Sequence, residues 1–144
     1  MAALAQLFAG THDDARARAD ALDAGQTPSP APHVDVPALT PLDLETLGEV
    51  AARVVRFGTG DLEPAEIDLD HETLFALPEF WCEVIAELAT TEDPDALDDV
   101  AEAWAATDEV SIPGDLHPVV RDIVGLVTQA ERAGLDVFLW VEEL

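Results

Sequence analysis

The sequence predicts a mainly helical α+β domain with four to five helices, a small sheet of two or three strands and a proline-rich N-terminal arm. The length of 144 residues fits a single domain with one core. Apolar residues make up 49% of the chain, more than a disordered acidic tail contains. They recur mostly at helical spacing. We expect residues 1–37 to form a helical segment with its arm and residues 38–144 to form an acidic α+β domain.

Residues 2–24 are predicted to be helical, with a break at Gly10. Thr11, followed three residues later by Asp14, is typical of a new helix N-cap. The next segment, residues 25–41, should be a linker or an extended wrap because proline disfavours regular structure. Its five prolines are Pro28, Pro30, Pro32, Pro37 and Pro41.

Thr40 and Pro41 are a favourable N-cap and first residue for the first helix of the acidic domain. Apolar residues then repeat at helical spacing until Gly58, which we expect to end the helix. The loop that follows contains residues 66–70, where apolar and acidic side chains alternate. This alternation favours a short, half-buried strand.

Three more helices are predicted, beginning at Pro78, at Asp93–Pro94 and at Asp115. Gly134 is well placed as the residue that ends the last of them. The apolar run over residues 137–141 is typical of a buried strand. Each of the chain's three tryptophans falls on an apolar face, and we expect them to share one core: Trp81, Trp104 and Trp140.

The charge of the chain restricts its partners. There are 31 acidic residues against six arginines and no lysine, for a formal net charge of −25. Such a surface repels polyanions, so direct nucleic-acid binding and docking on an anionic membrane are not expected. Two causes of the acidity remain open. One is a surface built to meet a cationic partner, and the other is adaptation to the interior of a salt-accumulating cell.

Two acidic stripes stand out on consecutive predicted helices. Each stripe lies opposite the apolar face of its own helix, and carboxylates four residues apart are about 6 Å apart along the axis. That spacing is close to the distance between successive phosphates of a nucleic-acid strand. Neither helix contains a Lys or Arg to offset the repulsion, so the stripes are either a solvated face or a partner-binding face. Their residues are Glu79, Glu83 and Glu87 on the first helix, and Asp95, Asp98, Asp99 and Glu102 on the second.

No catalytic residue, metal site or cofactor is predicted. His71 follows Asp68 and Asp70, but a strand would direct the two carboxylates to one side and the imidazole to the other. No two histidines have the i, i+4 spacing of a zinc helix. Cys82 is expected to be buried and structural, because acidic surroundings raise the pKa of a thiol and reduce its reactivity.

The single cysteine rules out an intramolecular disulfide and agrees with a reducing cytoplasm, so we expect a cytoplasmic protein. The apolar N-terminus has no basic region and therefore does not fit a signal peptide. The longest run of large apolar residues, 137–141, is too short to span a bilayer.

The C-terminal half of the chain resembles small uncharacterised acidic bacterial proteins, some of them of immunity-protein type. The resemblance lies in residues 97–109, in the long helix that follows and in residues 138–144. It implies no catalytic residues and suggests a protein that blocks a toxin.

These observations favour a non-catalytic acidic binding protein that neutralises a basic partner, as a toxin-immunity protein or a nucleic-acid mimic does. In either case carboxylates would take the place of phosphates, and electrostatic attraction would speed association. Two other classes stay open. One is a halophilic housekeeping protein whose acidity is solvent adaptation, and the other is a small enzyme that uses carboxylates.

Overall fold

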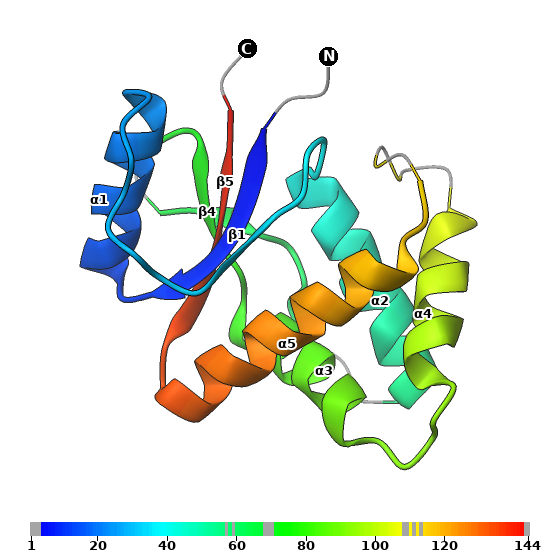
Figure 1. Ribbon diagram of the computed structural model, residues 1–144. Helices are drawn as coiled ribbons and strands as arrows, with labels where there is room; N and C mark the ends of the chain where they lie inside the picture. The colour runs from blue at the N-terminus through cyan, green and yellow to red at the C-terminus, as the bar shows by residue number, and fades with distance from the viewer. Residues whose placement is uncertain are drawn as a thin grey trace.

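A computed structural model of the chain describes residues 4–56, 58, 60–67, 71–107, 110, 112 and 114–142. Within these residues the fold is of the α+β class, with five helices and one five-stranded sheet (Figure 1). The elements in chain order are β1 (Ala5–Gly10), α1 (His12–Asp23), β2 (His33–Asp35), α2 (Pro41–Val55), β3 (Ala65–Glu66), β4 (Leu74–Ala76), α3 (Glu79–Thr90), α4 (Ala96–Ala105), α5 (His117–Ala133) and β5 (Asp136–Val141).

The sheet is larger than the two or three strands expected from the sequence. Its strand order is β2-β1-β5-β4-β3, and every neighbouring pair is antiparallel. The longest pairing joins the two ends of the chain, since Ala5 to Gly10 lie opposite Val141 to Asp136. The other three strands have two or three residues each, too short to show an alternating pattern in the sequence.

The prediction of a helix at the start of the chain is wrong for residues 5–10, which form β1. All six residues are buried, so the strand shows no alternation of apolar and polar side chains. Pairing with β5 on one side and β2 on the other overrides the helical propensity of its alanines. Because β1 and β2 lie in the same sheet as β5, the sheet extends across the boundary that we expected at residue 37.

The helical prediction holds for α1, which begins at the expected N-cap. The Thr11 hydroxyl accepts a hydrogen bond from the Asp14 amide, and the Asp14 carboxylate accepts one from the Thr11 amide. The proline-rich segment after α1 is extended, as expected. It returns along β1, where the Ala9 amide donates to the Pro32 carbonyl and the Val36 amide donates to the Ala5 carbonyl.

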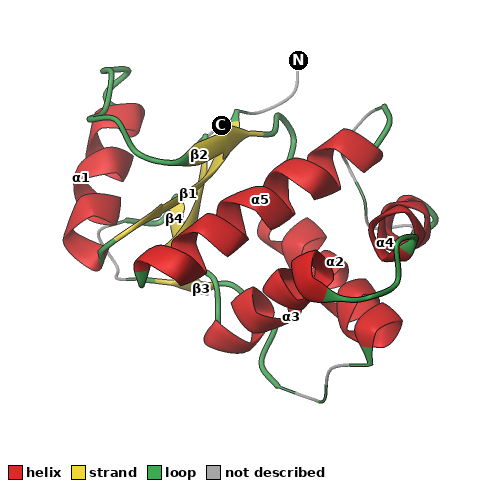
Figure 2. Cartoon of the chain, turned by 60° about the horizontal axis from the view of Figure 1, so that its bottom comes forward, coloured by secondary structure: helices red, strands yellow, loops and turns green. Residues whose placement is uncertain are grey.

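The sheet is covered on both faces. Helix α1 lies on one face, and α5 crosses the other with α2, α3 and α4 packed beyond it (Figures 1 and 2). This arrangement explains the continuous apolar run of β5, because its alternate side chains enter two different cores. Val137 and Leu139 belong to the large core on the α5 side, whereas Phe138 and Trp140 belong to a smaller core under α1.

The sequence had led us to expect that the three tryptophans share one core, and this prediction is wrong. Trp81 and Trp104 are both fully buried in the large core, on the opposite side of the sheet from Trp140. Their indole nitrogens donate hydrogen bonds to the first turn of α2, to the carbonyl of Leu44 at 2.8 Å and to that of Asp43 at 3.1 Å respectively. These bonds join α3 and α4 to the same end of α2.

The predicted helix ends are correct to within a few residues. Helix α2 has the expected capping box at Thr40, but it ends at Val55 with Arg56 in the left-handed conformation, before Gly58. Helix α3 begins after Pro78 and α5 ends at Gly134, as predicted. The caps of the other two helices differ from the prediction by one or two residues: Asp95 precedes α4 and Leu116 precedes α5.

The strand expected over residues 66–70 is confirmed only where it overlaps β3. That strand covers Ala65–Glu66, and residues 68–70, which include Asp68 and Asp70, lie outside the described part of the chain.

Candidate interaction surface

The acidic stripe on α3 lies beside the C-terminal end of α5. Glu79 and Glu83 are exposed and Glu87 is half-buried. Glu79 and Glu83 have two acidic neighbours, Glu131 at the end of α5 and Asp136 at the start of β5. All four carboxylates are close enough to Cys82 to raise the pKa of its thiol. This end of the molecule therefore combines negative charge from α3, α5 and β5.

Cys82 is buried within this group, as expected from the sequence. Burial, and after it the nearby carboxylates of Glu131, Asp136, Glu79 and Glu83, together raise the pKa of its thiol to about 12. A thiol with this pKa is almost entirely protonated at neutral pH, so it is a poor nucleophile.

The stripe on α4 is partly offset by basic side chains, which the sequence did not predict. Its own helix has no Lys or Arg, but the start of α5 packs beside it. Arg121 Nη2 lies 3.7 Å from Asp98 Oδ1. His117 Nε2 lies 3.9 Å from Asp98 Oδ1 and 4.0 Å from Glu102 Oε1. Asp95 and Asp99 of the same stripe are exposed.

His117 is held in place by a third carboxylate, that of Asp115. Its Nδ1 lies 2.6 Å from Oδ1 of Asp115, which also accepts a hydrogen bond from the His117 amide. The hydrogen bond to Asp115 raises the pKa of His117, and the charges of Asp115, Asp98 and Glu102 act in the same direction. The same side-chain hydrogen bond, followed by the one from the His117 amide, lowers the pKa of Asp115.

The two predicted stripes do not merge into one acidic face. The Asp98 carboxylate adjoins His117 at the first turn of α5, whereas Glu79 and Glu83 share the surroundings of Cys82 with Glu131 at the last turn. The fourteen helical steps from His117 to Glu131 extend about 21 Å along the axis of α5. Glu79 and Glu83 of α3 and Asp98 and Glu102 of α4 thus lie at opposite ends of α5.

A third acidic group, which sequence reasoning missed, lines a pocket of about 680 Å³ at the N-terminal end of α2. We call it the α2–β3 pocket. Helix α2 contributes one wall, the segment before and through β3 contributes the other, and β4 contributes an aromatic ring. The lining residues are Pro41, Leu42, Glu45, Asp61, Glu63, Pro64, Ala65, Glu66 and Phe75.

Like charges are concentrated around Glu45 in this pocket. Its side chain is half-buried, and burial is the largest cause of its raised pKa, followed by repulsion from Glu63, Glu49 and Asp61. Asp61 accepts a hydrogen bond from the Glu63 amide, which holds these two acidic residues in one turn of the loop. Among the described lining residues, every charged side chain is a carboxylate.

Part of this group was visible in the sequence. Glu45 and Glu49 have the same i, i+4 spacing on a predicted helix as the two stripes. The spacing does not show that the loop with Asp61 and Glu63 returns to the side of α2, because tertiary packing brings these two residues close to Glu45. Leu62 of this loop packs against the large core, which ties the segment to the body of the domain.

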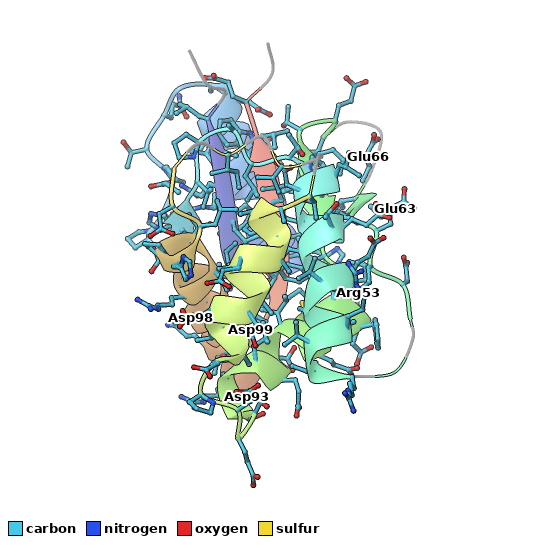
Figure 3. The ribbon with its side chains drawn as sticks, turned by 90° about the vertical axis from the view of Figure 1, so that its right-hand side faces the viewer. Arg53, Glu63, Glu66, Asp93, Asp98 and Asp99 are labelled. Carbon is cyan, nitrogen blue, oxygen red and sulfur yellow. The ribbon has the colours of Figure 1, made fainter. Side chains whose placement is uncertain are left out.

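The pocket and the α4 stripe lie on the same side of the molecule. Figure 3 shows Glu63 and Glu66 beside α2 and Asp98 and Asp99 on α4, all on the side that faces the viewer. Arg53 projects from α2 on this side as well (Figure 3), and its Nε donates to the Glu49 carbonyl at 3.4 Å. We call this side the α2–α4 face.

Other candidate chemistry has no support in the part of the chain that the structure describes. No group of three or more His, Cys, Asp or Glu side chains there has an arrangement that would hold a metal ion. His71 pairs across the structure with α1, its Nε2 lying 3.0 Å from Asp20 Oδ1. None of the described helices has the length and apolar character needed to cross a membrane.

Comparison of the chain with protein-family models, with curated proteins and with solved structures found no match.

Proposed function

We propose that this protein is a non-catalytic acidic binding protein that neutralises a basic partner protein, as an inhibitor of the toxin-immunity or nucleic-acid-mimic type. The observation that carries the proposal is the group of carboxylates around Glu45. The fold places Glu49, Asp61 and Glu63 close enough to raise the pKa of a half-buried carboxyl. Such repulsion is unfavourable in the free protein, and a partner cation at this position would relieve it.

The α4 stripe extends this negative potential over the α2–α4 face. Asp95, Asp99 and Glu102 are exposed, and Asp93 lies on the same side of the molecule (Figure 3). Carboxylates presented in this way attract a basic protein over a longer range than any single contact and accelerate its association. A basic site that normally grips phosphate would meet these carboxylates in place of the nucleic acid. The proposal needs no cofactor, and the single cysteine favours a cytoplasmic setting.

Charge reversal on the α2–α4 face tests the proposal. Glu63→Lys and Asp99→Lys change two exposed side chains that belong to neither core. The matched control is Asp13→Lys on α1 with Glu72→Lys before β4, two exposed side chains with the same total change of charge. Asp13 pairs with Arg16 of its own helix at 3.4 Å, an exposed contact that contributes little to stability. Asp98 is not used because its reversal would also disrupt the contacts with Arg121 and His117.

The three proteins are used to capture basic proteins from host lysate, and each captured protein is identified and titrated at several salt concentrations. We expect the wild type and the control to bind alike and the α2–α4 variant to bind at least about tenfold more weakly. Wild-type affinity should fall as salt rises. Equal capture by all three proteins would contradict the assignment of this face, and Glu83→Lys would then test the α3 stripe.

A further inference from the structure

We propose that the α2–β3 pocket receives an arginine side chain of the basic partner and is the anchor point of that interface. This inference rests on the proposed function and deepens it, because it names the group that is recognised. Two features of the pocket carry it: its charged lining is made of carboxylates, and the remaining wall is apolar.

The apolar wall includes one exposed leucine. Leu42 has 53% of its surface accessible, and among the described residues Leu4 is the other large apolar side chain exposed to this extent. The half-buried Pro41 and Phe75 and the buried Pro64 continue this wall. The wall lies within the same pocket as Glu45 and Glu63, so a ligand would meet apolar surface and negative charge together.

An arginine side chain matches this combination. Its three-carbon stem packs on apolar surface, and its planar guanidinium forms paired hydrogen bonds with carboxylates and stacks on aromatic rings. A lysine ammonium is a compact, strongly hydrated charge that makes less use of the wall. Phosphates and other anions are excluded by the carboxylates. Arginine is also among the side chains that most often dominate the energy of an interface.

The direct probe is the peptide Gly-Arg-Gly with acetylated and amidated ends, titrated into the full-length protein and followed by amide shifts in NMR spectra. The reference peptides contain lysine or citrulline in place of arginine. We expect saturable shifts at residues 42–45 and 61–66, weaker binding of the lysine peptide and no shifts with uncharged citrulline. Shifts spread over α3 and α4 as strongly as over the pocket would overturn the inference, as would equal binding of the arginine and citrulline peptides.

Variants separate recognition in the pocket from general attraction. Glu45→Gln with Glu63→Gln removes two charges from the pocket, and Asp95→Asn with Glu102→Gln removes two from α4 as a matched control. We expect the first pair of substitutions to weaken binding of the arginine peptide at least about tenfold and the second pair to change its affinity less than twofold. Leu42→Ala should weaken it as well while leaving the net charge unchanged, because Leu42 is part of the apolar wall.

Stability of the variants is checked by urea unfolding. The pocket variant should be at least as stable as the wild type, since it loses repulsion around Glu45. If the pocket variant still binds the captured basic partner as tightly as the wild type while the Lys variants of the α2–α4 face do not, the inference fails and the proposed function stands. If none of these variants affects partner binding, the proposed function fails as well.

Discussion

The indole nitrogen of Trp140, on the last strand, donates a 2.8 Å hydrogen bond to Oδ1 of Asp23, the last residue of α1. The same carboxylate accepts a hydrogen bond from the Thr73 hydroxyl, whose Oγ1 lies 3.1 Å from Oδ1 and 3.2 Å from Oδ2. Helix α1 contributes the two small buried side chains of Ala15 and Ala19 and the partly buried Leu22 to the core beneath it. These hydrogen bonds add to that limited apolar contact in attaching the helix to the sheet.

Replacing Asp23 tests this attachment. Asp23→Ala would leave the indole N–H of the largely buried Trp140 without its acceptor, so we expect a loss of about 1 kcal/mol in the free energy of unfolding. Asp23→Asn keeps a carbonyl oxygen at this position and should lose less. Urea unfolding followed by tryptophan fluorescence measures both. Equal stability of Asp23→Ala and the wild type would show that water replaces the carboxylate at no cost.

Two helical glycines should respond oppositely to alanine. A Cβ at Gly48 would lie 2.6 Å from Cδ1 of Trp81, so Gly48→Ala must displace the ring that bonds to the Leu44 carbonyl. We expect a loss of about 1–3 kcal/mol. A Cβ at Gly125 would meet no atom within 4 Å, and Gly125→Ala should stabilise α5 by about 0.5–1 kcal/mol.

The two alanine variants are each other's control, because both remove a helical glycine and add one methyl group. Thermal and urea unfolding of the three proteins gives the comparison. A Gly48→Ala protein as stable as Gly125→Ala would mean that α2 and α3 do not approach as closely as the structure shows.

The pair formed by His117 and Asp115 predicts a specific pH dependence. The pKa of His117 is raised above 6.5, so its stabilisation is complete below 6.5 and is lost as the pH rises through the raised value. The pKa of Asp115 is lowered below 3.8, so its stabilisation is complete above 3.8 and is lost as the pH falls through the lowered value. Between pH 3.8 and 6.5 both contributions are present.

An NMR titration of the imidazole protons checks this prediction directly. We expect the midpoint for His117 to lie above 6.5 and to decrease in Asp115→Asn, with a smaller decrease in Glu102→Gln. His33 can be followed in the same spectra as an internal reference, because its imidazole pairs with Asp35 of β2, 3.8 Å away, and Asp35 is unchanged in both variants. A His117 midpoint below 6.5 in the wild type would show that the contact with Asp115 is not formed in solution.

Salt dependence distinguishes a functional acidic surface from solvent adaptation. If the acidity serves a partner, the protein should melt cooperatively even at about 0.01 M ionic strength, where charges interact over about 30 Å. Glu45→Gln should raise the melting temperature at low salt, and this gain should diminish at about 1 M salt, where screening reduces the range to about 3 Å. A chain that is unfolded in dilute buffer and folds only in molar KCl would favour the halophilic alternative.

Local patterns in the sequence were sufficient for most of the helices. The capping residues Thr11 and Thr40 act through hydrogen bonds three residues away, so their effect is contained in the local sequence. Gly134 ends α5 because the left-handed backbone at φ 68° suits glycine. The buried strand at residues 137–141 is recognisable because its apolar run has no helical period.

The sheet and the candidate surface depend on contacts between distant residues. Strand β1 has no strand pattern of its own and exists because β5, at the other end of the chain, pairs with all six of its residues. In the same way, the sequence shows which carboxylates are spaced along a helix, but not that Arg121 lies beside Asp98 or that Glu63 lies beside Glu45.

The sequence by itself determined the charge of this protein, the ends of most helices and the burial of Cys82, because composition, capping and apolar period are local properties. Only the tertiary structure decided which carboxylates act together. Packing of α5 against both α3 and α4 places Glu79 and Glu83 at one end of α5 and Asp98 and Glu102 at the other. The return of residues 61–66 to α2 assembles an acidic pocket from segments that share no sequence pattern. Electrostatic repulsion depends on distance in space, and distance in space between remote segments is set by the packing of the core.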